Sequence, residues 1–157
     1  MRNRRFIAMH RGGLLTVEDH RRLMKWARDC AIHVLHLTEM KEDRRLTAAL
    51  EVARRWEEGK ASTGKAMKAS LGAHAAARGF TEPADIAVAR SIGQAVATAH
   101  MADHSLGAAL YALKAVRLAG IPVAEESEWQ MKQLQDGLPD RVELVRGIMM
   151  QKQQTME

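Results

Sequence analysis

Alanine is the residue that most limits what this chain can fold into. It occupies 26 of the 157 positions, whereas aromatic residues make up only 4% of the chain and proline occurs three times. Alanine loses no side-chain freedom when a helix fixes it, so it has the highest intrinsic helix propensity. Residues that favour a pleated sheet are sparse, and no Asn-Gly or Asp-Gly pair separates two alternating apolar runs. The sequence therefore predicts an all-α fold.

The length and the cysteine content exclude several other classes of protein. A chain of 157 residues has the usual length of one domain, so we expect a single helical domain over residues 1–157. The single cysteine, Cys30, excludes a disulfide framework and a cysteine-rich zinc module. The longest apolar run, residues 106–113, is far shorter than the ~20 residues that a membrane span requires. The apolar segment at residues 6–9 is too short for a secretory signal, so we expect a cytoplasmic protein with no membrane partner.

Helix boundaries follow from the capping residues and the apolar spacing. The side chain of Thr16 can cap the first helix, Gly59 can end the second, and Pro83 suits the first turn of the fourth. An unbroken helix over residues 83–119 would be much longer than is common, so we place a break near residues 102–105. Between an irregular lead-in at 1–15 and a frayed tail at 152–157, the expected helices are 17–37, 44–58, 63–78, 83–102, 106–118, 124–135 and 139–151. These predict a bundle of about six or seven helices, packed closely because alanine and glycine occupy core positions.

The charge of the chain is basic overall and unevenly distributed. The formal net charge is +5, made up of +4 for residues 1–58, +4 for residues 59–119 and −3 for residues 120–157. A basic balance permits binding to an acidic partner or to nucleic acid. Because no nucleic-acid-binding motif accompanies the charge, we do not expect a nucleic-acid partner.

Trp129 lies within the only acidic stretch of the sequence. Glu125, Glu126 and Glu128 surround it. An aromatic anchor ringed by charge is typical of a protein-interaction hot spot. The alternative is that this helix simply packs on the bundle through its apolar side, which includes Trp129.

Histidine and aspartate residues recur at helical spacing in two parts of the sequence. Asp29 and His33 fall on one stripe of the first helix, and a second group places Asp103 between His100 and His104, one turn apart. Two such histidines with a carboxylate are a pattern by which a helix holds zinc or iron, which makes the second group a weak alternative metal site. A buried polar network is the stronger interpretation, and we expect no metal, cofactor or catalytic residue. The candidate pocket residues are Asp29, His33, His74, His100, Asp103 and His104.

Three segments carry a pattern that extends beyond single residues. They are LTVEDHRRLMKWARDCAIHVL at residues 15–35, AHAAAR at residues 73–78 and ATAHMADHSLGAA at residues 97–109. Together they resemble the all-helical putative immunity-protein family of bacterial polymorphic toxin systems, over roughly residues 14–118. The resemblance implies a small cytosolic bacterial protein that neutralises a cognate toxin by binding it. The residues that it assigns to the shared pattern are Asp29, His33, His74, His100 and His104.

Two functions follow as hypotheses. The first is a non-enzymatic protein-binding module of toxin–antitoxin type, whose partner is a cognate toxin and whose candidate contact is formed by Glu125, Glu126, Glu128 and Trp129. The alternative is a helical protein whose histidine and aspartate pocket binds a metal or a small ligand and could act as an enzyme. The alanine-rich helix faces also permit a homodimer.

Overall fold

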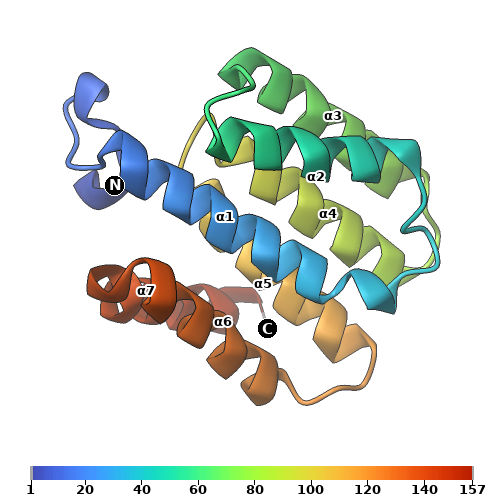
Figure 1. Cartoon of the computed structure of the whole chain (residues 1–157). Helices are drawn as coiled ribbons and strands as arrows, with labels where there is room; N and C mark the ends of the chain where they lie inside the picture. The colour runs from blue at the N-terminus through green and yellow to red at the C-terminus, as the bar shows by residue number, and fades with distance from the viewer. Residues whose placement is uncertain (1, 157) are drawn as a thin grey trace.

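The computed structural model describes residues 2–156, and these residues form seven α-helices and no β-strand (Figure 1). The helices are α1 Val17–His33, α2 Arg44–Glu57, α3 Thr63–Gly79, α4 Pro83–Ala97, α5 His104–Leu118, α6 Val123–Gly137 and α7 Val142–Met156. The predicted all-α, single-domain fold is confirmed. Residues 1 and 157, at the outer ends of the predicted lead-in and tail, lie outside the described residues. No helix within the described part of the chain has both the length and the apolar character needed to cross a membrane.

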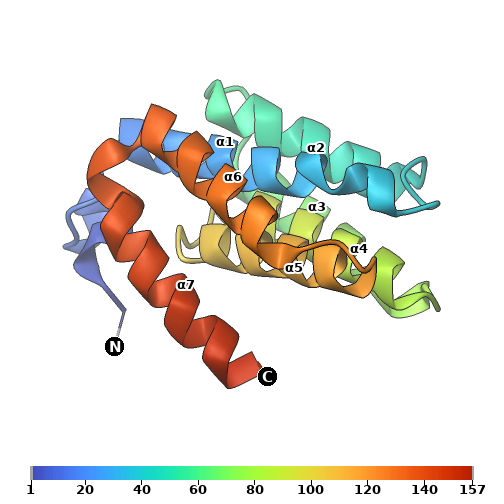
Figure 2. The ribbon, with the colours of Figure 1, turned by 90° about the horizontal axis from the view of Figure 1, so that it is seen from below.

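Helix α4 lies at the centre of the bundle. It packs between α3 and α5 in one layer and against α1 and α2 in the other (Figure 2). Helix α6 lies against α1 and α5, and α7 contacts α5 and α6. Because helices cover α4 on several sides, its apolar side chains Val88, Ile92 and Val96 are fully buried.

Small residues allow the helices of the α3–α4–α5 layer to approach one another closely. The Ser91 hydroxyl of α4 donates to the Ala108 carbonyl of α5 (2.8 Å), and the Ser70 hydroxyl of α3 donates to the Gly93 carbonyl of α4 (2.9 Å). A side chain as short as serine reaches the backbone of the next helix only when the two helix axes are close together. Alanine is the commonest residue of the core, as the predicted close packing requires.

The first four helices begin at the predicted residues, but α1 and α7 differ from the prediction. The Thr16 hydroxyl caps α1 by accepting from the Asp19 amide (3.1 Å). Helix α1 ends at His33 and is followed by a 3-10 turn, Leu35–Leu37, rather than continuing as α-helix. Such tightened turns are a common way to satisfy the last carbonyls of a helix. Helix α7 spans Val142–Met156, rather than residues 139–151.

The break between α4 and α5 occurs earlier than predicted, over residues 98–103. The last turn tightens here, because the carbonyls of Ala95, Val96 and Ala97 accept from amides three residues later. The next carbonyl, that of Thr98, accepts from the Nε2–H of His20 of α1 (2.6 Å). His100 therefore lies in the loop, whereas His104 is the first residue of α5. The prediction that these two histidines lie one turn apart on a single helix is wrong.

The lead-in, residues 2–15, folds back on itself through two 3-10 turns, Arg4–Phe6 and Met9–Arg11. The Leu15 amide donates to the Ile7 carbonyl and the Met9 amide to the Leu15 carbonyl, both at 3.0 Å. Gly13 makes this possible, since a Cβ at that position would overlap the Ile7 carbonyl. Phe6 and Leu15 are buried in the core, so the lead-in is seated against the helices.

Candidate functional site

Two adjoining hollows, of about 510 Å³ and about 160 Å³, lie where the lead-in meets the helices. We call them together the lead-in groove. The lead-in, the first turn of α1, the end of α2, the start of α3 and the loop over residues 98–103 form its walls. The side chains that line both hollows are Ala8, His10, His20, Thr63 and Ala99.

His20 occupies the centre of the lead-in groove. Its ring meets the edge of Trp56 with centroids 4.8 Å apart, while its Nε2–H is held by the Thr98 carbonyl. Burial lowers the pKa of His20 below its usual value of 6.5, and the nearby His10 acts in the same direction. The imidazole is therefore neutral at neutral pH and serves as a fixed hydrogen-bond donor.

The rim of the lead-in groove is apolar and open to solvent. Met9 is 61% exposed and Val17 is 60% exposed, and both line the larger hollow. Trp56 forms part of the wall and is half-buried, with its indole Nε1–H donating to the Thr63 hydroxyl (3.3 Å). Exposed apolar side chains that gather around a hollow are typical of an interaction surface.

His33, the last residue of α1, contacts Glu126 and Trp129 of α6, at the end of α1 that is far from the lead-in groove. The Nδ1–H of His33 donates to the Glu126 carboxylate (2.7 Å), and the His33 ring stacks on Trp129 with centroids 3.5 Å apart and the planes 4° from parallel. Asp29 instead pairs with Lys25 on its own helix (2.7 Å). Trp129 and Glu126 are thus joined to His33 within the molecule.

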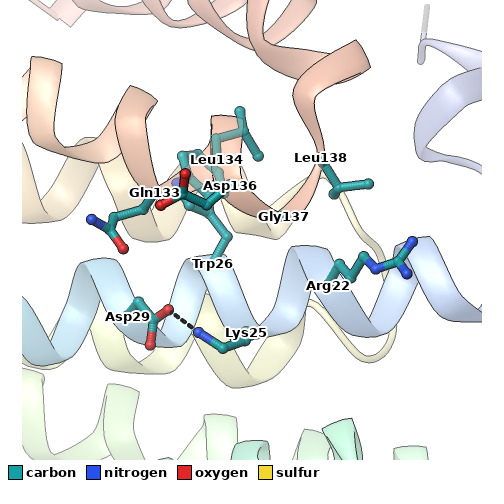
Figure 3. Close-up of a pocket in the computed structure, with 9 residues that line it drawn as sticks. All are labelled: Arg22, Lys25, Trp26, Asp29, Gln133, Leu134, Asp136, Gly137 and Leu138. Atoms are coloured by element: carbon teal, nitrogen blue, oxygen red, sulfur yellow. Dashed lines mark hydrogen bonds and ion pairs between the residues drawn. The ribbon is translucent and has the colours of Figure 1, made fainter.

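A shallow groove of about 280 Å³ runs between α1 and the C-terminal half of α6, and Asp29 lies on its α1 side (Figure 3). Figure 3 shows the Lys25 and Asp29 side chains joined by their ion pair below the α6 residues that form the opposite wall. Trp26 closes the groove from within by donating its Nε1–H to the Gln130 carbonyl (2.8 Å). The other two glutamates of α6 lie outside this groove, with Glu125 exposed and Glu128 paired to Arg146 of α7 (2.9 Å).

His74 and His104 lie on the layer formed by α3, α4 and α5. The His74 Nδ1 accepts from Arg90 (2.7 Å), and the His104 Nδ1–H donates to the Gln94 amide oxygen (2.8 Å). Burial lowers the pKa of both histidines, and the Arg90 charge lowers that of His74 further. Both rings are neutral spacers between helices at neutral pH.

The six predicted pocket residues therefore do not share one pocket. His100 is exposed and lines the smaller hollow of the lead-in groove, while Asp103 forms an ion pair with Arg2 (2.5 Å). Within residues 2–156, no group of three His, Cys, Asp or Glu side chains is arranged to hold a metal ion, and the combination of His100, Asp103 and His104 is no exception. Sequence reasoning missed His20 and Trp56, because their meeting depends on how α1 packs against α2 and not on spacing within a helix.

The fold and the groove together define a small all-α protein with exposed apolar side chains around the lead-in groove. The family model described as Imm-5 like putative immunity protein matches residues 13–137, and the chain belongs to this family. The resemblance predicted from three segments is confirmed and extends through α6. Comparison with curated proteins and with solved structures finds no significant match. Residues 2–12 of the lead-in and all of α7 lie outside the matched range.

Proposed function

We propose that the chain is an immunity protein that neutralises a cognate bacterial toxin by binding to it in the cytoplasm. The observation that carries this proposal is the family match, which extends over residues 13–137 and so includes six of the seven helices described. An immunity protein of this kind blocks its toxin by covering it, and a few desolvated anchor side chains supply most of the affinity.

The chemistry of the histidines and of Cys30 supports a binding role over an enzymatic one. His20, His33, His74 and His104 each hold a partner within the molecule, at distances of 2.6 to 2.8 Å. Burial raises the pKa of the Cys30 thiol well above its usual value, which keeps it protonated and poorly nucleophilic. These groups therefore have structural roles in the bundle, and we assign toxin binding to exposed residues instead.

Co-expression tests the proposal directly. The probe is the toxin domain encoded beside the gene of this chain, expressed with and without the chain in the same host. We expect the toxin domain alone to stop growth, and the chain to restore growth and to co-purify with the toxin. Growth arrest that the chain does not relieve, together with no co-purification, would overturn the proposal.

A titration separates binding from catalysis. Purified toxin domain is mixed with increasing amounts of the chain, and the residual toxin activity is measured. A binding inhibitor abolishes activity only when the two proteins are equimolar, since each molecule covers one toxin. Complete inactivation by a small fraction of an equivalent would show that the chain acts as an enzyme and would contradict the proposed mechanism.

A further inference from the structure

We propose that the lead-in groove is the surface that receives the toxin, and that it takes a segment carrying an apolar anchor side chain flanked by carboxylates. This inference rests on the proposed function and names the site and the chemistry through which that function is performed. The occupant is a protein segment of the toxin, because the groove consists of two adjoining hollows and exposed apolar side chains border it from two elements.

Met9 and Val17 form the apolar rim of the larger hollow. Met9 belongs to the lead-in and Val17 to the first turn of α1, so the two exposed side chains lie on separate elements that border the same hollow. Leu14, 53% exposed, adds to the same end of the molecule. Water at such a rim is displaced when a partner's apolar side chain enters the hollow, and this gain favours binding.

Cations without an ion-pair partner lie in and near the lead-in groove. Arg11 lines the smaller hollow, whereas Arg21, one helical turn after Val17, lies outside the lining with its guanidinium beside Gly59. Neither has an ion-pair partner within the described part of the chain. Glu18 is the only carboxylate among the described residues that line the two hollows, and the nearby Asp19 and Asp103 are paired with Arg22 and Arg2. A toxin segment bearing carboxylates complements this potential.

The two walls of the groove have different origins. Helices α1, α2 and α3 belong to the part of the chain that matches the family model, whereas Ala8, Met9 and His10 precede the matched range. A surface that combines a shared scaffold with a separate lead-in lets one fold serve different toxins, because the lead-in can favour one partner and exclude others.

The acidic face of α6 is the competing docking surface. The Trp129 ring already stacks on His33, and Glu126 already accepts the His33 hydrogen bond. A partner could use only the part of each side chain that these contacts leave exposed, unless it broke them. The lead-in groove requires no such rearrangement, so binding there loses less free energy to reorganisation.

Calorimetry with the purified toxin domain tests the docking surface. The variant M9E/V17E places two carboxylates at the apolar rim, where both side chains are exposed and the fold can accept them. We expect its affinity to fall by at least ~30-fold, the loss typical of a hot-spot anchor. The matched control is Leu71→Glu, which charges a 67% exposed side chain on α3, away from the groove, and should bind as the original chain does.

The outcomes distinguish the docking surface from the proposed function. If the original chain binds the toxin and M9E/V17E binds equally well, the groove is wrong and the proposed function stands. If a Glu125→Lys/Glu128→Lys variant loses affinity while M9E/V17E does not, the toxin docks on α6. If the original chain does not bind at all, the proposed function fails.

Circular dichroism and size-exclusion measurements on each variant show whether it stays folded. If the free chain is a dimer and M9E/V17E dissociates it, the groove is a surface for self-association instead.

Discussion

His20 joins three parts of the molecule through a single side chain. It belongs to α1, packs its ring edge on Trp56 of α2 and donates to the Thr98 carbonyl at the end of α4. The Thr98 carbonyl is the first one beyond α4, so the imidazole binds the backbone directly after that helix. Burial, which lowers the pKa of His20, keeps the ring in the neutral form that the site accommodates.

The His20 environment predicts a dependence of stability on pH. Because the folded-state pKa of His20 lies below 6.5, the unfolded chain binds a proton more readily than the folded chain. The stabilisation is therefore complete above about pH 6.5 and is lost as the pH falls below that value. In His20→Gln, an amide donor replaces the imidazole without a titrating group. Urea unfolding at about pH 7.5 and about pH 5.5 should show a smaller loss of unfolding free energy for this variant than for the original chain.

His74 and His104 also have lowered pKa values. The original chain and the His20→Gln variant are therefore both expected to lose some stability in acid. The comparison between them isolates the part due to His20. Equal losses in the two proteins would show that His20 does not contribute to the pH dependence of stability.

Spacing within a helix shows which residues share a face, but not which faces of different helices meet. This is why the sequence grouped Asp29 and His33 correctly on one side of α1 and still failed to identify their neighbours. Asp29 pairs with Lys25, and His33 contacts Glu126 from a helix 93 residues away. His20 was missed for a related reason, since its partners lie on elements that only the folded lead-in and bundle bring together.

At the scale of elements, the lead-in depends on the close approach of Gly13 to Ile7. A methyl group at residue 13 would overlap the Ile7 carbonyl, so Gly13→Ala should displace the lead-in while the helices keep their core. We expect faster amide exchange over residues 4–15 and a lower melting temperature. Gly147→Ala is the matched control, because nothing lies within 4 Å of a Cβ at this exposed helical position. It should stabilise the protein by about 0.5–1 kcal/mol.

The contact between α4 and α5 gives a second prediction at this scale. Ala108 is fully buried, and its carbonyl accepts from the Ser91 hydroxyl, so a larger side chain would push the two helices apart. Ala108→Leu should lower the free energy of unfolding by about 1–3 kcal/mol, whereas Leu46→Met, a change of shape at nearly constant volume, should cost less than about 1.5 kcal/mol. Chemical denaturation of both variants measures the difference. A tolerant Ala108→Leu variant would mean that the small core residues do not hold the helices close.

Helix starts were predicted better than helix ends. The starts depend on local capping residues such as Thr16, Asp43 and Ser62, whose side chains accept from amides two or three residues later. The segments that follow α1 and α4 are held by distant partners, through the Thr38–Asp85 hydrogen bond (2.6 Å) and the His20–Thr98 contact. Local sequence therefore determines where these helices begin, and tertiary packing determines where they stop.

At the scale of the whole molecule, the fold and the family were both predictable from the chain, and the docking surface was not. Helix propensity and helix capping depend only on residues close together in the sequence, so they predict an all-α bundle even when the packing of its helices is not known. The lead-in groove is formed by five elements, from the lead-in to the loop over residues 98–103. Arg11 of the lead-in and Val17 of α1 belong to separate elements, and only the folded chain brings both to the lead-in groove.

Hydrogen–deuterium exchange of the chain with and without the toxin domain shows both whether the toxin binds and where it binds. We expect slower exchange on binding in the lead-in and the first turn of α1, and in the segment that joins α2 to α3. Slower exchange confined to α6, or an exchange pattern that the toxin does not change at all, would contradict this expectation.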